Sequence, residues 1–138
     1  MRRGWRAVLA SGLGSLIVSG CVTAPDAEAV AMPVCPIETR SWQAWINAMP
    51  GPDMRPTLIV KGEALLPEKA SATLTAGPTD RMMPPGQRVT LSVEPSDRAA
   101  GWQEIRLDIA PALPDYASVI VGCGGNEIVR ITPIEAIQ

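Results

Sequence analysis

The most reactive side chains in this sequence belong to three cysteines, and Cys123 has the most unusual neighbours of the three. It lies in the stretch IVGCGGNEI, residues 120–128, where it ends an apolar run and precedes two glycines. A cysteine in such a place could be a nucleophile, a metal ligand or half of a disulfide. A nucleophilic thiol needs a base or a cation beside it, and the sequence has no histidine and no CxxC motif. The absence of histidine also removes serine–histidine pairs and the commonest zinc ligand.

The N-terminal residues have the layout of an export signal. Three arginines precede an uncharged, largely apolar run over residues 7–18, which is too short to span a bilayer as a helix. The sequence VSGC follows at residues 18–21. This segment resembles the lipobox of bacterial lipoprotein precursors, in which small residues precede a cysteine. The resemblance implies that residues 1–20 form a signal helix removed by signal peptidase II, and that Cys21 carries a diacylglyceride. The alternative is a cleaved secretory signal in which Cys21 has no role.

The same resemblance predicts where the mature protein lies. Its new N-terminal amino group would carry a further acyl chain such as palmitate, and two or three chains make membrane anchoring stable. Val22, rather than an aspartate, follows the cysteine, which by the rule for well-studied Gram-negative lipoproteins directs the protein to the outer membrane, facing the periplasm. Residues 21–34 are alanine-rich and interrupted by proline, and we interpret them as a flexible tether to a single domain over residues 35–138.

If Cys21 is consumed by lipid, Cys35 and Cys123 remain as an even pair in an oxidising compartment. Such a pair is most simply a disulfide, and we predict one between them. It would connect the start of the domain to its penultimate strand. The competing interpretation is a reactive thiol at Cys123, which lacks the base it would need.

Composition excludes several classes of function. Without its three signal-peptide arginines the chain has nine basic and 14 acidic side chains, a net charge of −5. That balance argues against a nucleic-acid partner and against electrostatic binding to anionic lipid. The size suits one domain, and 14 prolines disfavour long helices.

Hydrophobic periodicity predicts an all-β domain. The clearest strand covers residues 102–110, where Ile105, Leu107 and Ile109 point inward and charged residues point outward. The GGN turn after Cys123 indicates a hairpin, with no phosphate-binding motif. Residues 37–49 fit both a strand and a helix, and tryptophan content favours a strand. The other expected strands are 57–66 (with Gly62 a candidate bulge), 72–76, 87–94, 116–123 and 127–134. We therefore predict a single antiparallel, immunoglobulin-like β-sandwich of about seven strands.

The loop over residues 80–88 is the stretch that we expect to contact a partner. Its candidate residues are Arg81, Met82, Met83, Pro84, Pro85 and Arg88. Two prolines would stiffen the exposed methionines, as in inhibitor loops. The favoured alternative has both methionines folded back to fill the end of the sandwich. A third interpretation is a Cu(I) site that combines them with Met32, Met49 or Met54, although MxxM spacing is absent.

No pair of side chains suggests catalysis. Glu104 and Asp108 lie on the solvent face of one expected strand, as ordinary surface charges do. Trp42 and Trp45 fall on opposite strand faces and cannot form one stacking platform for a sugar. We therefore expect a non-enzymatic lipoprotein without cofactor or metal, which binds an unknown envelope protein in assembly or as a chaperone-like module. Protease inhibition through residues 80–88 and Met-based Cu(I) binding are the alternatives.

Overall fold

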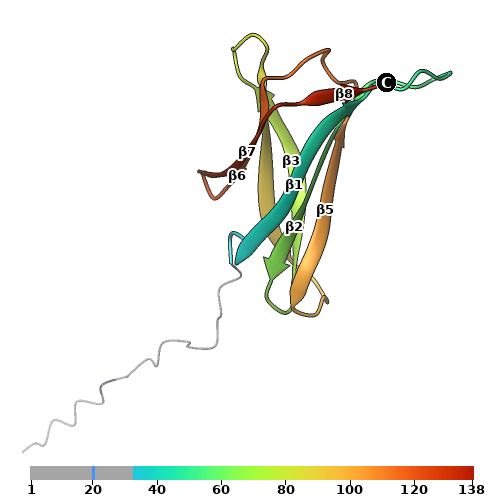
Figure 1. Cartoon of the computed structure of the whole chain (residues 1–138). Helices are drawn as coiled ribbons and strands as arrows, with labels where there is room; N and C mark the ends of the chain where they lie inside the picture. Colours follow the sequence, from blue (N-terminus) through green and yellow to red (C-terminus); the bar gives the residue numbers. More distant parts are fainter. Residues whose placement is uncertain (1–19, 21–32) are drawn as a thin grey trace, which may run out of the picture. The chain divides into compact units, whose positions relative to one another are not determined.

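The computed structural model describes residue 20 and residues 33–138, and it is all-β, as predicted (Figure 1). The predicted signal segment, Cys21 and most of the predicted tether lie outside the described residues. The part that is described has no helix that could cross a membrane. Eight strands form two four-stranded sheets, a β-sandwich. The strands are β1 (Glu38–Asn47), β2 (Thr57–Leu66), β3 (Ala70–Thr79), β4 (Gly86–Pro95), β5 (Gly101–Ile109), β6 (Ser118–Cys123), β7 (Asn126–Ile131) and β8 (Glu135–Ile137).

The sheets are mixed, so the prediction of a purely antiparallel sandwich was wrong. Sheet A has the order β5-β2-β1-β8 and sheet B the order β3-β4-β6-β7, with β4–β6 and β1–β8 parallel. The chain leaves sheet B after β4, adds β5 to sheet A and returns beside β4. Two reversals restore the direction of the strand, which makes the β4–β6 pair parallel. The last strand, β8, was not expected, because three exposed residues after Pro133 leave no periodic pattern.

The core lies between the two sheets and is built from the inward-facing residues that alternation predicts. On β4, Val89 and Leu91 are buried while Arg88 and Thr90 are exposed. On β5, Ile105 is buried and the outward charges are exposed. Seven side chains of the core are almost completely buried: Leu58, Val60, Leu66, Val89, Leu91, Val119 and Val121. The apolar area that these side chains remove from water is the main stabilising contribution to the sandwich.

The ambiguous segment 37–49 is a strand, and its irregularity explains the ambiguity. Ser41 and Trp42 both lie opposite Gly62 of β2, so β1 contains a β-bulge, and Ser41 has a φ of 58°. We expected a bulge at Gly62, but Gly62 lies in a regularly paired strand and the extra residue is on its partner. Trp42 packs its indole over Gly62, and an added Cβ there would lie 2.5 Å from the ring.

Replacing Gly62 with alanine should therefore destabilise the domain. We expect Gly62→Ala to lower the free energy of unfolding by about 1–3 kcal/mol, because the indole must move within a packed core. Urea unfolding followed by tryptophan fluorescence measures the change. In the control Gly51→Ala, the added methyl meets only the flexible side chain of Met54, which is 55% exposed. The control should change stability by less than about 0.5 kcal/mol, and equal effects of the two variants would contradict the packing argument.

Candidate functional site

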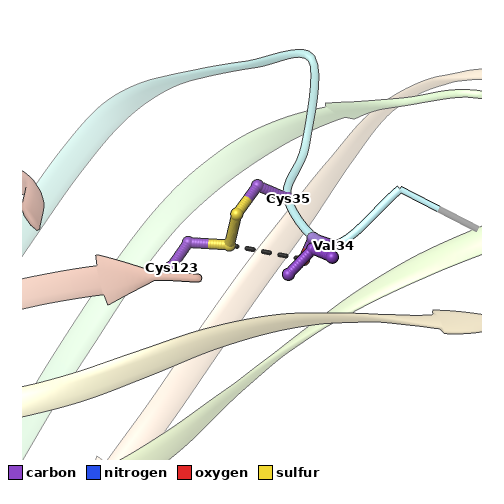
Figure 2. Close-up of a disulfide and its surroundings, with 3 residues drawn as sticks. All are labelled: Val34, Cys35 and Cys123. Atoms are coloured by element: carbon purple, nitrogen blue, oxygen red, sulfur yellow. Dashed lines mark hydrogen bonds between the residues drawn. A yellow bond between two sulfur atoms is a disulfide. The ribbon is translucent and has the colours of Figure 1, made fainter. Parts of the chain in front are cut away.

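Cys35 and Cys123 form the predicted disulfide (Figure 2). Cys35 precedes β1, Cys123 ends β6, and their Cα atoms are 5.9 Å apart. Cys123 is 2% exposed, and its Sγ lies 3.4 Å from the Val34 carbonyl oxygen. A disulfide sulfur has no proton, so this is a close contact in the oxidised protein; only a reduced thiol could donate a hydrogen bond there. The residue is therefore structural, and the following Gly124 and Gly125, both at positive φ, form the predicted turn between β6 and β7.

The disulfide defines two ends of the sandwich. We call the end at Cys35 and Cys123 the proximal end. The opposite, distal end contains the loops over 48–56, 80–85 and 110–117, because β6 starts beside the first residue of β4 and runs from there to Cys123. Figure 1 shows these loops at the end of the sandwich away from the start of β1. The loop that we expected to contact a partner therefore lies at the opposite end from Cys35, where the domain begins.

Asp80 closes the loop over residues 80–85. Its Oδ1 accepts hydrogen bonds from the backbone N–H groups of Met82 at 3.0 Å and Gly86 at 2.8 Å. Its own N–H donates to the Gly86 carbonyl oxygen at 2.9 Å. A Cβ on Gly86 would lie 2.6 Å from Asp80 Oδ2, so a larger residue at this position would displace the carboxylate that closes the loop. These hydrogen bonds, first that from Gly86 and then that from Met82, lower the pKa of Asp80 below its ordinary value.

Met82 and Met83 point into solvent, so the interpretation that they fill the end of the sandwich was wrong. Met82 is 62% exposed and Met83 is 92% exposed. The three hydrogen bonds around Asp80 hold the base of the loop in a turn whose tip cannot reach the core. Local hydrogen bonding of an aspartate therefore outweighs the gap-filling tendency of methionine. The sequence feature that could have indicated this turn is an aspartate, Asp80, and a glycine, Gly86, on either side of the two prolines.

A second loop, 110–117, lies beside the first. Tyr116 is buried, with 4% exposure, and its hydroxyl accepts a hydrogen bond from the Leu113 N–H at 3.0 Å. The Ala117 N–H donates to the Pro85 carbonyl oxygen at 2.9 Å, which joins the two loops. Leu113 is thereby held outward, with 42% of its surface exposed. This residue could not be identified from the sequence, because a single leucine between prolines has no periodicity.

The two loops form one concave, almost entirely apolar surface. The concavity has a volume of about 590 Å³ and is lined by Met83, Pro84, Pro85, Leu113, Pro114 and Asp115. With the adjacent Met82 we call its apolar residues, 82–85, 113 and 114, the distal apolar surface. Arg81 is exposed next to it, whereas Arg88 lies in β4 and lines a separate hollow on the outer face of sheet B. The structure thus brings together most of the predicted loop residues and separates Arg88 from them.

The other candidate residues form surface ion pairs or pack against the core, as residues without a catalytic role do. Glu104 forms an ion pair with Lys61 at 3.2 Å, and Asp108 forms one with Arg106 at 2.7 Å. These pairs lie on the outer face of sheet A and have the character of solvated strand charges. Trp42 packs against the core. Residues 33–138 contain no group of three acidic, histidine or cysteine side chains that could hold a metal ion. Met32 lies outside the described residues, so the Cu(I) hypothesis stays a prediction.

Removing the Asp80 carboxylate should loosen the loop without unfolding the domain. We expect Asp80→Ala to accelerate amide hydrogen exchange at Met82 and Gly86, whose N–H groups lose their acceptor, and to leave the core amides unchanged. The pKa of Asp80 is lowered in the fold, so its contribution is present above the ordinary value of 3.8 and is lost as pH falls below it through the folded pKa. Exchange in the wild type, corrected for intrinsic rates, should rise there. Unchanged exchange at both amides in the variant would show that the Asp80 carboxylate does not hold the loop.

Comparison of the chain with protein-family models, with curated proteins and with solved structures gave no match in any of the three.

Proposed function

We propose that the protein is a lipid-anchored, non-enzymatic module of the bacterial cell envelope that binds another protein through its distal apolar surface. The observation that carries the proposal is the 92% exposure of Met83 in a loop that is held in place by two hydrogen bonds to the Asp80 carboxylate and one between backbone groups. A contiguous apolar surface on an ordered loop is unfavourable in water, and its burial against a partner is favourable.

The two loops are well suited to binding. Pro84, Pro85 and Pro114 restrict the backbone, and the Ala117–Pro85 hydrogen bond couples one loop to the other. A surface that is already ordered loses little conformational entropy on association, so more of the apolar burial contributes to affinity. Met83 and Leu113 are the side chains that we expect to insert into a partner's pockets.

The anchor and the binding surface lie at opposite ends in this proposal. Cys21 carries the lipid, and residues 22–34 form the spacer. The disulfide fixes the start of the domain at the proximal end. The distal apolar surface then lies at the end of the domain opposite the attachment point, which favours a partner in the periplasm or the peptidoglycan layer over contact with the anchoring outer membrane.

A pair of charge substitutions tests the proposal. Met83→Asp should abolish affinity capture of the partner from crosslinked envelopes, because a carboxylate in an apolar contact is desolvated without a counterion. The matched control is Ile37→Asp, which introduces the same charge in place of another exposed apolar residue. Ile37 is 68% exposed and lies near the proximal end. Ile37→Asp should capture the same protein as the wild type. A partner retained by Met83→Asp would refute the role of this surface.

Protease inhibition is the second candidate, and the closed loop around Asp80 favours it. Met82 and Met83 are exposed in a turn that hydrogen bonds to Asp80 hold in place. Inhibitor loops present their reactive bond in a turn held in a similar way. In this case the purified protein should inhibit a serine, cysteine or metalloprotease that accepts methionine, and Met83→Asp should weaken inhibition. Absence of inhibition across the three classes rejects this candidate and leaves the first intact.

A further inference from the structure

Strand edges are the places where a β-sandwich can pair with another chain, and most edges of this one are irregular. Two of the outer strands, β3 and β7, contain register shifts, β3 between Ala76 and Thr79 and β7 beside the Val121–Gly122 step of its partner. The uncovered half of β1 contains the Ser41–Trp42 bulge, and β8 has only three residues. Bulges and short strands of this kind hinder the addition of a further strand.

The strand β5 is the exception among the described edges. Its nine residues, Gly101–Ile109, pair with β2 without a register shift, and β5 is the outermost strand of sheet A (Figure 1). Alternate backbone N–H and C=O groups of a regular edge strand point away from the sheet. The strand therefore offers a row of backbone donors and acceptors to a partner, except near its start, where the Trp102 carbonyl oxygen already accepts a hydrogen bond from the Arg98 side chain at 3.4 Å.

Beside β5, the gap between the two sheets is closed by one side chain near the start of the strand and is open farther along it. The Gln103 carboxamide accepts from the Ala72 N–H at 2.8 Å and donates to the Ala72 carbonyl oxygen at 3.0 Å. It thus makes the pair of hydrogen bonds that a residue of a neighbouring strand would make. Beyond it a hollow of about 340 Å³ lies between β3 and β5, lined in part by Leu74, Ile105 and Arg106.

Farther along β5, past this hollow, the inward-facing apolar residues are incompletely covered. Leu107 and Ile109 face inward and pack against the core, yet both are only half-buried, in contrast to Ile105 at 4% exposure. An extended segment laid along β5 would cover them while pairing with the backbone. On the outward face such a segment would meet Glu104, Arg106 and Asp108 in alternation.

We propose that β5 binds an extended segment of another polypeptide as an added strand. The segment has apolar residues toward the sandwich and, on its outward face, basic residues opposite Glu104 and Asp108 with an acidic residue opposite Arg106. This acid–base–acid order is the same in both directions, so charge selects the partner's composition and not its orientation. The ion pairs that these side chains make now are exposed and exchange readily. The site is separate from the distal apolar surface.

Two synthetic peptides test the site. The matched peptide carries Lys-Val-Glu-Val-Lys within a capped, valine-alternating decapeptide, and the mismatched one carries Glu-Val-Lys-Val-Glu. With the full-length exported protein in detergent, the matched peptide should slow amide hydrogen exchange in residues 101–109. The mismatched peptide should bind about tenfold more weakly, because three attractive cross-strand pairs become repulsive.

Variants locate the contact. Arg106→Glu should transfer the preference to a Lys-Val-Lys-Val-Lys peptide, whereas Arg88→Glu, the same charge change on sheet B, should leave the peptide preference unaltered. Met83→Asp should bind the matched peptide as the wild type does, which separates this site from the proposed function. Equal binding of matched and mismatched peptides, or protection of residues 70–79 or 126–131 in place of β5, would overturn the proposal. So would protection of β5 that rises with protein concentration alone, since the occupant would then be a second copy of this chain.

Discussion

Replacing Cys35 and Cys123 together by alanine should lower the free energy of unfolding by about 2–5 kcal/mol. The disulfide joins residues 88 positions apart, so its loss greatly increases the conformational freedom of the unfolded chain. A domain of this size is stabilised by only about 5–15 kcal/mol. The double variant would therefore lose a large part of its stability, even though the sheets keep all their backbone pairing.

Chemical denaturation of a chain that begins at Val22 measures this effect. Reductant supplies the matched control: it should shift the unfolding curve of the wild type to that of the double variant and leave the variant's own curve unchanged. Intact mass under non-reducing conditions should be two hydrogen atoms below that of the reduced wild type, with no thiol open to alkylation. Coincident curves for oxidised wild type and double variant would mean that the disulfide does not stabilise the fold.

Replacing Cys21 by alanine should abolish lipidation and block removal of the signal segment. If the lipobox resemblance holds, the thiol of Cys21 is the atom that receives the diacylglyceride, and no other residue nearby can replace it. The expected result is loss of labelling by radioactive palmitate and accumulation of the uncleaved precursor, since signal peptidase II acts on the lipid-modified chain. Detergent phase separation and the mass of the N-terminal peptide measure the two effects.

The control for that experiment is Cys35→Ala, which removes a cysteine from the domain and should leave lipidation intact. Membrane association and palmitate labelling should be the same as in the wild type, although the domain is less stable. An acylated, cleaved Cys21→Ala protein would show that the anchor lies elsewhere. A wild-type protein released without lipid would identify the N-terminal segment as an ordinary secretory signal.

Alternating hydrophobicity was enough to predict the fold class and most of the strands. The predicted strand 57–66 has the bounds of β2, and the inward residues of β4 and β5 are those expected. Periodicity records which face of a strand is buried but not which strand is its neighbour. The parallel β4–β6 pair therefore could not be predicted from the sequence.

Irregular backbone was the other limit on prediction. Residues 41 and 42 disturb the alternation of β1, and this bulge made a strand resemble a helix. At Gly62 the sequence indicated an unusual position, but the reason is the indole of Trp42 on the neighbouring strand. A glycine in a strand indicates that another group approaches closely at that position. Which side chain does so depends on tertiary packing.

The candidate site was predicted in part for the same reason. Prolines and methionines marked the loop over 80–88 as unusual, and its most exposed residue, Met83, was among those named. Leu113 and Pro114, which complete the distal apolar surface, lie about 30 positions away and reach it through the hydrogen bond between Ala117 and Pro85. Contacts between loops depend on the strands that carry them, so a local pattern cannot reveal them.

Site-specific photo-crosslinking in living cells tests the proposed function most directly. A photoreactive amino acid is placed in the lipidated protein at positions 83 and 113 on the distal apolar surface. Positions 37, near the proximal end, and 75, on the outer face of β3, serve as controls. We predict one common crosslinked protein from positions 83 and 113 and none of it from 37 or 75. The same protein crosslinked from all four positions, or from the controls alone, would contradict a partner bound at the distal end.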